Sequence, residues 1–398
     1  MSFSDILKKH SKNQVLLALQ KTADDHQLAM AAWRLPLQDK LYMICGQAQR
    51  FSENEDFKPE NVGPGFCFFP FRTSEDTPGI LIQPTILLSF EGANINILSE
   101  EGIKVFKTFM EILTSGQVTE NNKGKNNLTE SSESRFKEIV VQAREQIRKE
   151  GDFKKVVLAR NQFVDPPSDF SPTDLFLKTA QSYPHAFAFL FSYSPFGTWM
   201  GATPEILVQV TKENTFKTVA LAGTQSSEGK DTSDAVWTQK EIEEQALVSR
   251  YIINCFKQIR LREFEEEGPL TVRAAGLLHL KTYFSVDLNQ IEYKGLGNDM
   301  LKLLHPTSAV CGMPRNEAMQ FILDKEDTDR EYFSGFSGPV NIDNEINIFV
   351  NLRCARLDQE KIVLFSGAGI TRDSNPDKEW LETSLKIKTI GDLINPTS

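Results

Sequence analysis

The stretch Ser366-Gly-Ala-Gly-Ile-Thr-Arg-Asp-Ser-Asn-Pro-Asp-Lys-Glu-Trp-Leu-Glu-Thr-Ser-Leu-Lys386 joins a predicted strand to a predicted helix. Residues 361–365 are typical of a strand, and Gly367 and Gly369 allow the backbone to approach a neighbour closely or to adopt a positive φ. Asn375, followed by a proline, predicts a helix start, with asparagine as the N-cap and proline in the first turn. The stretch therefore predicts a glycine turn that leads into a helix.

The predicted helix carries a polar stripe. Four side chains recur at positions i, i+3, i+4 and i+7 and share one face of the helix, namely Glu379, Glu382, Thr383 and Lys386. From the helix alone, the commoner interpretation is a solvated outer face with an ordinary Glu–Lys pair. The alternative is a metal and carboxylate site, which requires support from elsewhere in the chain.

Composition limits the classes of function. A chain of 398 residues with 40% hydrophobic and 25% charged residues is typical of a soluble globular protein with a large core. A net charge of −10 argues against nucleic acid or an anionic membrane surface as a partner. Five scattered cysteines without a C-x-x-C motif indicate reduced thiols. Without an apolar signal core or a membrane-length apolar run, we expect a cytoplasmic protein with no membrane partner.

Strand signals are dense from residue 153 onward. The predicted strands cover residues 155–160, 186–193, 198–210 with a Gly and Pro break, 217–224, 277–283, 346–355 and 361–365. Hairpin-length spacings and irregularly placed helices favour an α+β fold with extensive antiparallel sheet. Residues 114–133 are polar and are interpreted as an internal loop. We therefore predict one domain, 1–398, with a variable N-terminal part, 1–134, and a motif-bearing part, 135–395.

A second candidate helix opens at Thr238, with a possible capping box to Glu241. Glu244 lies one turn before Val248, the first residue of a buried stripe, and so projects from the end of the apolar face. A carboxylate in that position is costly unless it is paired or bound to a metal ion. A place at the wet end of the helix explains it equally well.

The second part of the chain carries ten short motifs in succession. They are Lys155-Val-Val-Leu-Ala-Arg160, Gly201-Ala-Thr-Pro-Glu205, Leu221-Ala-Gly-Thr224, Lys240-Glu-x-x-Glu244, His279-Leu280, Leu304-His-Pro-Thr307, Arg330-x-x-Phe-Ser-Gly335, Asn351-Leu-Arg-Cys-Ala355, Phe365-Ser-Gly-Ala-Gly-Ile370 and Glu379-Trp-Leu-Glu-Thr-x-x-Lys386. In this order they resemble the chorismate-utilising enzymes, and among these the isochorismate synthases most closely. The resemblance covers about residues 135–395, whereas residues 1–134 match only in length and general character.

The resemblance implies a fold and a reaction. The fold is α+β, a single large domain with two packed, mainly antiparallel β-sheets flanked by helices. The reaction is an isomerisation of chorismate to isochorismate, in which water attacks C2 and the C4 hydroxyl leaves, with Lys155 as the base and Glu205 as the acid. Burial lowers the pKa of a lysine and raises that of a glutamate, as these roles require. From the residues alone, Lys155 could instead guard a strand edge and Glu205 could lie in an exposed turn.

The resemblance also implies a metal site. Glu244 and Glu382 match the Mg²⁺ ligands of the family, with Glu379 beside them and Glu241 acting through water. A small set of oxygen ligands suits Mg²⁺ rather than zinc.

The remaining polar residues match positions that bind the substrate. Arg353 and Lys386 match the residues that take the enolpyruvyl carboxylate, helped by backbone N–H groups near Gly367. Arginine suits two-point recognition of a carboxylate. The ring side is expected to be lined by Gly223 and Thr224, with His279 nearby.

Two positions separate this chain from sister activities. Anthranilate synthases carry glutamine where Lys155 stands, and aminodeoxychorismate synthases carry a nucleophilic lysine where Ala222 stands. Both differences favour water over ammonia as the nucleophile, so we expect no glutamine amidotransferase subunit. We also expect a monomer or weak dimer. The intact Lys155 and Glu205 disfavour a non-catalytic chorismate-binding module. Salicylate synthase, which adds pyruvate elimination, remains the alternative, and the pathway, menaquinone or siderophore biosynthesis, stays open.

Overall fold

A computed structural model describes residues 7–395 except 8, 54, 91–99, 117–127, 150, 227, 228, 230, 275 and 359. The N-terminal part contains α2 (Lys12–Asp25), β1 (Ala29–Arg34), β2 (Leu41–Phe51), η1 (Pro59–Asn61), β3 (Gly65–Phe69), β4 (Gly79–Ser89) and α3 (Glu100–Ser115). Most of the loop predicted over 114–133 lies outside the described residues.

The motif-bearing part alternates strands and helices irregularly, as expected for an α+β fold. Its first elements are α4 (Glu133–Lys149), β5 (Lys155–Val164), α5 (Pro172–Ser182), β6 (Phe187–Tyr193), η2 (Ser194–Phe196), β7 (Gly197–Thr203), β8 (Ile206–Val210), β9 (Thr215–Ser226), η3 (Thr232–Asp234) and α6 (Gln239–Gln258). These are followed by β10 (Glu265–Ala274), β11 (Leu277–Asp287), α7 (Leu296–Leu304), β12 (Gly312–Met313), α8 (Arg315–Lys325), β13 (Phe336–Ile342), β14 (Glu345–Val350), β15 (Cys354–Leu357), β16 (Ile362–Ile370) and α9 (Pro376–Ile394).

Hydrogen bonds link sixteen strands of the described chain into one continuous sheet. Its order is β10-β11-β9-β8-β14-β13-β3-β4-β2-β1-β6-β7-β15-β16-β5-β12. All the paired strands are antiparallel. We call β10 to β3 the first half and β2 to β12 the second half. Strand β4 joins them, because it pairs with β3 through residues 80–82 and with β2 along its whole length.

Aromatic side chains fill the space between the two halves. Phe68 of β3 stacks on Phe191 of β6 with the ring centroids 4.2 Å apart, and Phe349 of β14 stacks on Phe187 of β6 at 4.3 Å. Such pairs contribute about 0.5–1.5 kcal/mol each beyond the burial of their area. The prediction of two packed antiparallel sheets is therefore confirmed, with the refinement that they are halves of one sheet.

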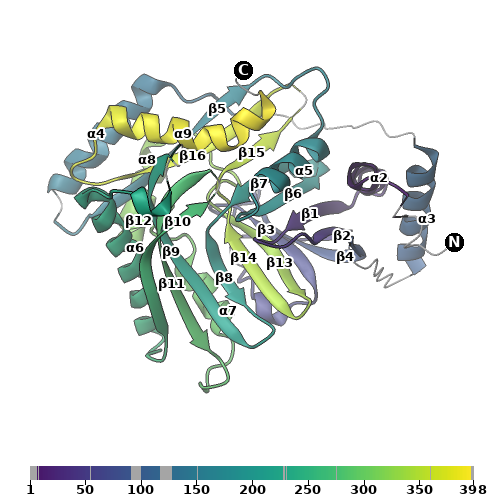
Figure 1. The fold of residues 1–398 in the computed structure, drawn as a ribbon, viewed down its shortest axis with the longest axis horizontal. Coiled ribbons are helices and arrows are strands. Elements are labelled where there is room, and N and C mark those ends of the chain that lie inside the picture. Colours follow the sequence, from purple (N-terminus) through teal and green to yellow (C-terminus); the bar gives the residue numbers. More distant parts are fainter. Residues whose placement is uncertain are drawn as a thin grey trace.

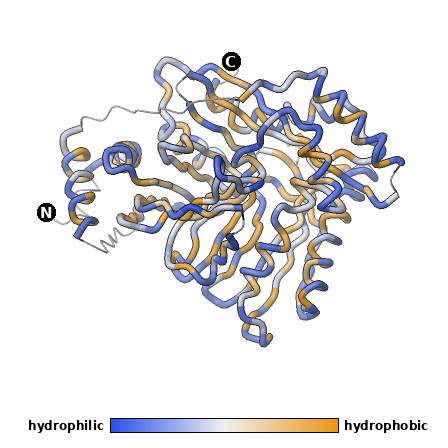
Figure 2. The backbone as a smooth tube through the Cα atoms, turned by 180° about the vertical axis from the view of Figure 1, so that it is seen from behind, coloured by the Kyte–Doolittle hydropathy of each residue, from blue (hydrophilic) through white to orange (hydrophobic). Residues whose placement is uncertain are grey.

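Helices cover the outer faces. Helices α2, α3, α5 and α9 pack in one apolar cluster on the second half, and α6 and α7 pack in another on the first half. Figure 1 shows α9 lying across β16 and α6 running beside β9. In Figure 2 the inner strands carry long hydrophobic stretches, whereas the peripheral helices alternate between hydrophobic and hydrophilic positions. None of the helices in the described part has the length and apolar character needed to cross a membrane.

The chain crosses between the halves at two short segments that matter for the site. The first lies between β7, which ends at Thr203 in the second half, and β8, which begins at Ile206 in the first. The Gly and Pro break predicted within 198–210 is thus confirmed. Glu205 lies on this crossing.

The second crossing lies between β14, which ends at Val350, and β15, which begins at Cys354 in the other half. The prediction of one strand over 346–355 is therefore wrong. Both flanking strands are mostly buried and follow each other closely, so their pattern does not reveal the change of sheet half. Arg353 lies on this crossing with φ of +48°, a conformation uncommon for residues other than glycine.

Candidate active site

Both crossings border a cavity of about 70 Å³ between the two halves. Its walls include most of the residues singled out from the sequence, namely Glu205, Gly223, Thr224, Glu244, His279, Arg353, Gly367, Gly369, Glu382 and Lys386. The first half supplies the residues of β9, β11 and α6, and the second half supplies those of β16 and α9. Side chains far apart in sequence therefore meet where the two halves face each other.

Glu205 is buried, with 3% of its surface exposed, so the alternative of an exposed turn residue is wrong. The Thr307 hydroxyl lies 3.5 Å from its Oε1 and is its donor. Burial raises the pKa of Glu205 to about 7, against the opposing effect of the Lys155 ammonium. A carboxyl with this pKa is partly protonated at neutral pH and can donate a proton.

Lys155 begins β5 and is fully buried. Its strand lies between β16 and β12, so the alternative of a guard at an exposed strand edge is wrong. The Lys155 Nζ lies 2.9 Å from Oε1 of Glu244, which projects from the second turn of α6. The carboxylate of Glu244 is thus paired, and the interpretation of a wet helix end is not needed.

Gly369 makes room for this ion pair. A Cβ atom at this position would lie 2.5 Å from Glu244 Oε1 and 2.9 Å from Lys155 Cε. Strand β16 continues through Gly367 and Gly369 to Ile370, so the predicted glycine turn is wrong. Close approach of side chains from two other elements, rather than a turn, accounts for the glycine at 369.

The polar stripe of α9 faces the interior. Glu379 and Thr383 are buried, whereas Leu381 and Leu385 on the opposite side are 62% and 40% exposed. The interpretation of this stripe as a solvated outer face is therefore wrong. Asn375 caps the helix as predicted, accepting the backbone N–H groups of Asp377 and Lys378.

Arg160 of β5 fixes the inward orientation of α9. Its Nε donates to Thr383 Oγ1 at 2.7 Å and its Nη2 donates to Ser384 Oγ at 2.9 Å. The guanidinium carbon also lies 3.8 Å from the centroid of the Trp380 ring, a cation–π contact. These contacts orient α9 so that its carboxylates point toward the cavity.

Three carboxylates expected to bind metal each have a lysine partner. Besides the Glu244 pair, Glu382 Oε1 lies 2.7 Å from Lys386 Nζ, and Glu379 Oε1 lies 2.6 Å from Lys240 Nζ. Burial would raise the pKa of Glu382, but Lys386 and Lys240 together hold it below its ordinary value. Burial raises the pKa of Glu379, and Lys240 only partly offsets this effect.

The donor chemistry fits Mg²⁺. All three candidate ligands offer carboxylate oxygens, and Glu379 Oε2 is buried without a hydrogen-bond partner in the protein. In this arrangement, however, no three acidic, histidine or cysteine side chains of the described residues converge as metal ligands. Glu241 accepts the Thr238 N–H in the predicted capping box, and its expected action through water stays a prediction. The carboxylates would therefore have to leave their lysines to hold an ion.

One wall of the cavity is formed by β9 and β11. His279 is buried, and its Nδ1 lies 2.8 Å from the Gly223 carbonyl oxygen, while Nε2 has no partner in the protein. Burial, with a smaller effect of Arg353, lowers the pKa of His279 to about 3, so this ring is neutral at pH 7. Gly223 has φ of +66°, and a Cβ there would lie 3.2 Å from the Trp237 ring.

Two cations also border the cavity. Arg353 is buried and its Nη1 has no hydrogen-bond partner in the protein. Burial lowers its pKa to about 10, which leaves it charged at neutral pH. Lys386 donates to the Gly367 carbonyl at 2.9 Å as well as pairing with Glu382. An anionic ligand could be held here.

Sequence reasoning missed Lys281. It lies two residues after His279 on β11 and therefore on the same face of that strand, and its Cα partner on β9 is Leu221, a cavity residue. Burial lowers the pKa of Lys281 to about 8, with Glu205 opposing. The sequence did contain a signal for Lys281, because residues two apart on a strand share a face and His279 was already a candidate.

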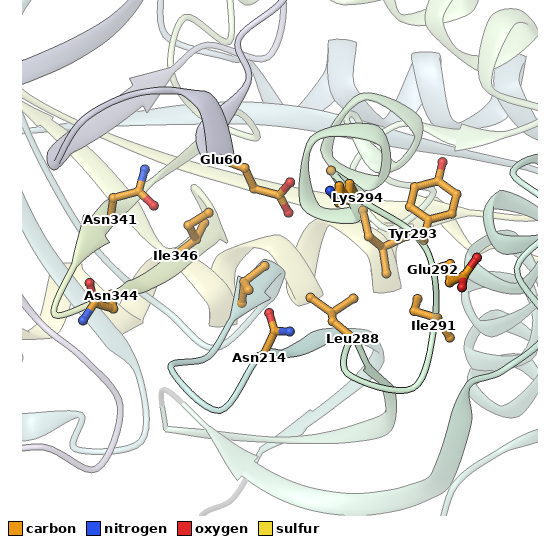
Figure 3. Close-up of a pocket in the computed structure, with 13 residues that line it drawn as sticks. Glu60, Asn214, Leu288, Ile291, Glu292, Tyr293, Lys294, Asn341, Asn344 and Ile346 are labelled. Atoms are coloured by element: carbon orange, nitrogen blue, oxygen red, sulfur yellow. The ribbon is translucent and has the colours of Figure 1, made fainter.

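A larger cavity, of about 960 Å³, lies elsewhere and lacks this chemistry. Figure 3 shows its lining, which includes Glu60, Asn214 and Asn341. Glu60 accepts the Gly297 N–H at 2.8 Å, and Asn341 donates to the carbonyl oxygens of residues 59 and 62. Because these polar groups already serve the fold, the smaller cavity is the candidate active site.

The chain is similar in sequence to named isochorismate synthases. It is 26% identical over 252 residues to isochorismate synthase DhbC of Bacillus subtilis, covering 61% of this chain and 63% of that one. It is 28% identical over 242 residues to isochorismate synthase EntC of Escherichia coli K-12, covering 59% of this chain and 61% of that one. The matched region thus spans less than two thirds of these relatives.

The fold is similar to that of solved structures over nearly the whole chain. The menaquinone-specific isochorismate synthase MenF of Escherichia coli superposes with a TM-score of 0.75 at 21% identity, over 97% of this chain and 92% of that one. A chain described as a putative DhbC from Bacillus anthracis gives 0.72 at 22% identity, over 95% and 100%. The family model described as Chorismate binding enzyme matches residues 83–395, most of the chain, so this protein belongs to the chorismate-binding enzyme family.

Proposed function

We propose that this protein converts chorismate into isochorismate in a Mg²⁺-dependent isomerisation. The observation that carries the proposal is that the buried Glu205, with its pKa raised to about 7, lines the cavity and interacts electrostatically with the buried Lys155, which lies beside Glu244 of the same cavity. Similarity to proteins named isochorismate synthases supports the same reaction. Relatives named for vibriobactin and for menaquinone synthesis both occur, so the pathway stays unassigned.

The two side chains divide the proton transfers. Lys155 takes a proton from a water molecule that attacks C2 of the ring, the ring double bonds shift, and the C4–oxygen bond breaks. Glu205 gives its proton to the departing hydroxyl, so one water enters and one leaves. In its ion pair with Glu244 the Lys155 amine is protonated, so it has to release Glu244 and lose that proton before it can accept one from the attacking water.

Two cations in the cavity lining are suited to the substrate's carboxylates. Arg353 offers an Nη1 without a hydrogen-bond partner in the protein. Lys386 becomes available for a substrate carboxylate once its ion pair with Glu382 opens. Glu244 and Glu382, with Glu379 beside them, would hold Mg²⁺, which when bound would neutralise the ring carboxylate. The neutral His279 presents Nε2 on the ring side without adding charge.

Product analysis tests the proposal. The purified chain alone is incubated with chorismate and Mg²⁺, with a chelator in a parallel reaction, and the products are separated by chromatography. We expect isochorismate with Mg²⁺ and none with the chelator, and no need for an amidotransferase partner. Salicylate as the main product would establish the alternative activity. Anthranilate from chorismate and ammonia, without isochorismate, would refute both.

A further inference from the structure

Lys240 lies in the first turn of α6 and reaches across to α9. Its Nζ lies 2.6 Å from Oε1 of Glu379, a side chain that is 1% exposed. The Lys240 ammonium also interacts electrostatically with Glu382 and Glu244. One ammonium group therefore pairs with Glu379 and is attracted by the other two carboxylates that the proposed function assigns to the metal.

The partner of Lys240 is only half satisfied. Glu379 Oε1 is held by Lys240 and the Ser374 hydroxyl interacts with the same carboxyl, but Oε2 is buried without a well-formed hydrogen bond in the protein. A buried carboxylate with a free oxygen is costly unless a cation completes its environment. Lys240 is thus the cation that compensates this buried carboxylate in the metal-free protein.

Lys240 differs from the other two lysines of this cluster. Lys155 is assigned to the attacking water, and Lys386, which lines the cavity, is assigned to a substrate carboxylate. Lys240 has no such task, and its side chain is 31% exposed on a flexible four-carbon stem. It can leave Glu379 and extend into solvent without disturbing the core.

We propose that Lys240 is a tethered counter-cation, which holds Glu379 when no metal is bound and competes with a divalent ion for that carboxylate. The inference rests on the proposed Mg²⁺ site and deepens it. A fixed positive charge beside a carboxylate opposes a second cation, so the affinity for metal reflects the cost of displacing Lys240. The side chain also avoids leaving a buried carboxylate unpaired in the metal-free protein.

Metal binding to the protein without chorismate tests the competition. Mn²⁺ serves as the probe, and its free fraction is measured by electron paramagnetic resonance for the wild type, Lys240→Met and Lys257→Met. Lys257 is an exposed lysine in the last turn of the same helix, about 25 Å away at 1.5 Å per residue, and is the matched control. We expect at least tenfold tighter Mn²⁺ binding by Lys240→Met and no change for the control. Equal or weaker binding by Lys240→Met would overturn the proposal.

Thermal unfolding supplies a second measurement that detects the pairing itself. In chelator, Lys240→Met is expected to unfold at a lower temperature than wild type, and Mg²⁺ is expected to raise that temperature more than in wild type. The double variant Lys240→Met/Glu379→Gln should regain most of the loss in chelator, because no buried charge is left unpaired. An unchanged unfolding temperature for Lys240→Met would also overturn the proposal. Neither assay contains chorismate, so both test the role of Lys240 without depending on turnover. The proposed reaction is tested by the product analysis alone.

Discussion

The two cavities of this protein differ in how their polar groups are satisfied. Around the larger cavity, Glu60 and Asn341 bond to backbone groups of neighbouring segments, and Tyr293 donates to Asp299 at 2.6 Å. Around the smaller cavity, His279 Nε2 and Arg353 Nη1 are buried without a partner in the protein. Both cavities contain glutamate, lysine and glycine, so residue types do not separate them.

The difference indicates that incomplete satisfaction, not volume, marks the candidate active site. A fold that leaves buried donors and acceptors unpaired loses free energy, of the order of 1–3 kcal/mol for each group. Such a loss is explained if a ligand completes the bonds. Equivalent substitutions in the two cavities should therefore affect different properties, namely activity in one and stability in the other.

Lysine substitutions should give the largest contrast. Lys155→Ala is expected to lower isochorismate formation by about 10²–10⁴-fold, the usual loss when a positioned base is removed. Lys294→Ala, in the lining of the larger cavity, should retain wild-type activity. Rates are measured in both directions, because in reverse Lys155 becomes the acid. A Lys155 variant that lost only the forward reaction, with substrate affinities unchanged, would contradict the shared two-residue mechanism.

Glu205→Gln should change stability in a pH-dependent manner. Folding raises the pKa of this carboxyl from 4.5 to about 7, a difference that corresponds to about 3 kcal/mol. Above pH 7 the wild type carries the full cost of burying the charge, whereas below pH 4.5 the group is protonated in both states and the cost vanishes. The variant should therefore be more stable than wild type at pH 8, and its advantage should shrink as the pH falls from 7 toward 5.

Chemical denaturation at pH 8, 6 and 5 measures this advantage, and turnover measured at pH 7 should be lost in the same variant. An advantage that does not change with pH would show that Glu205 is not buried as a titrating group. Glu60→Gln provides the comparison in the larger cavity, where the carboxylate is already bonded to a backbone N–H.

Much of the fold could be predicted from local patterns. The helix start at Asn375, the capping box at Thr238 and the strand break before Glu205 depend on a few adjacent residues, and the structure confirms each. The antiparallel α+β class followed from hairpin-length spacings. These features are local, so a single sequence carries enough information about them.

The orientation of the site could not be predicted in this way. The stripe of α9 faces inward because Arg160, on a distant strand, bonds to Thr383 and Ser384. The strand predicted over 346–355 breaks at the crossing between sheet halves, which places Arg353 in the cavity. Each depends on contacts between segments far apart in the chain, and periodicity within one segment does not encode them.

Glycine substitutions should have an intermediate effect. In Gly369→Ala the new methyl group would lie 2.5 Å from Glu244 Oε1 and 2.9 Å from Lys155 Cε, so the ion pair must shift. We expect at least a tenfold loss of activity, since overpacking of this kind costs about 1–3 kcal/mol. In Gly297→Ala the methyl group would lie 2.6 Å from Glu60 Oε1, at the larger cavity, and should leave activity unchanged. Steady-state kinetics measure both variants. A larger loss of activity in Gly297→Ala than in Gly369→Ala would contradict the comparison.

The smallest expected effect is that of Glu60→Ala. The Glu60 carboxylate accepts the backbone N–H of Gly297 at 2.8 Å, in the first turn of α7, and lies 3.3 Å from Asn298 Nδ2. It therefore acts as a cap from a distant segment, and loss of a cap typically costs about 1 kcal/mol. Glu60→Ala should lower the free energy of unfolding by about this amount, measured by denaturant titration, and leave turnover of chorismate unchanged. Because burial raises the pKa of Glu60, part of the loss is offset at any pH where the wild type buries a charged carboxylate. A variant that kept its stability but lost activity would show that the larger cavity takes part in the reaction, and the contrast between the two cavities would then be wrong.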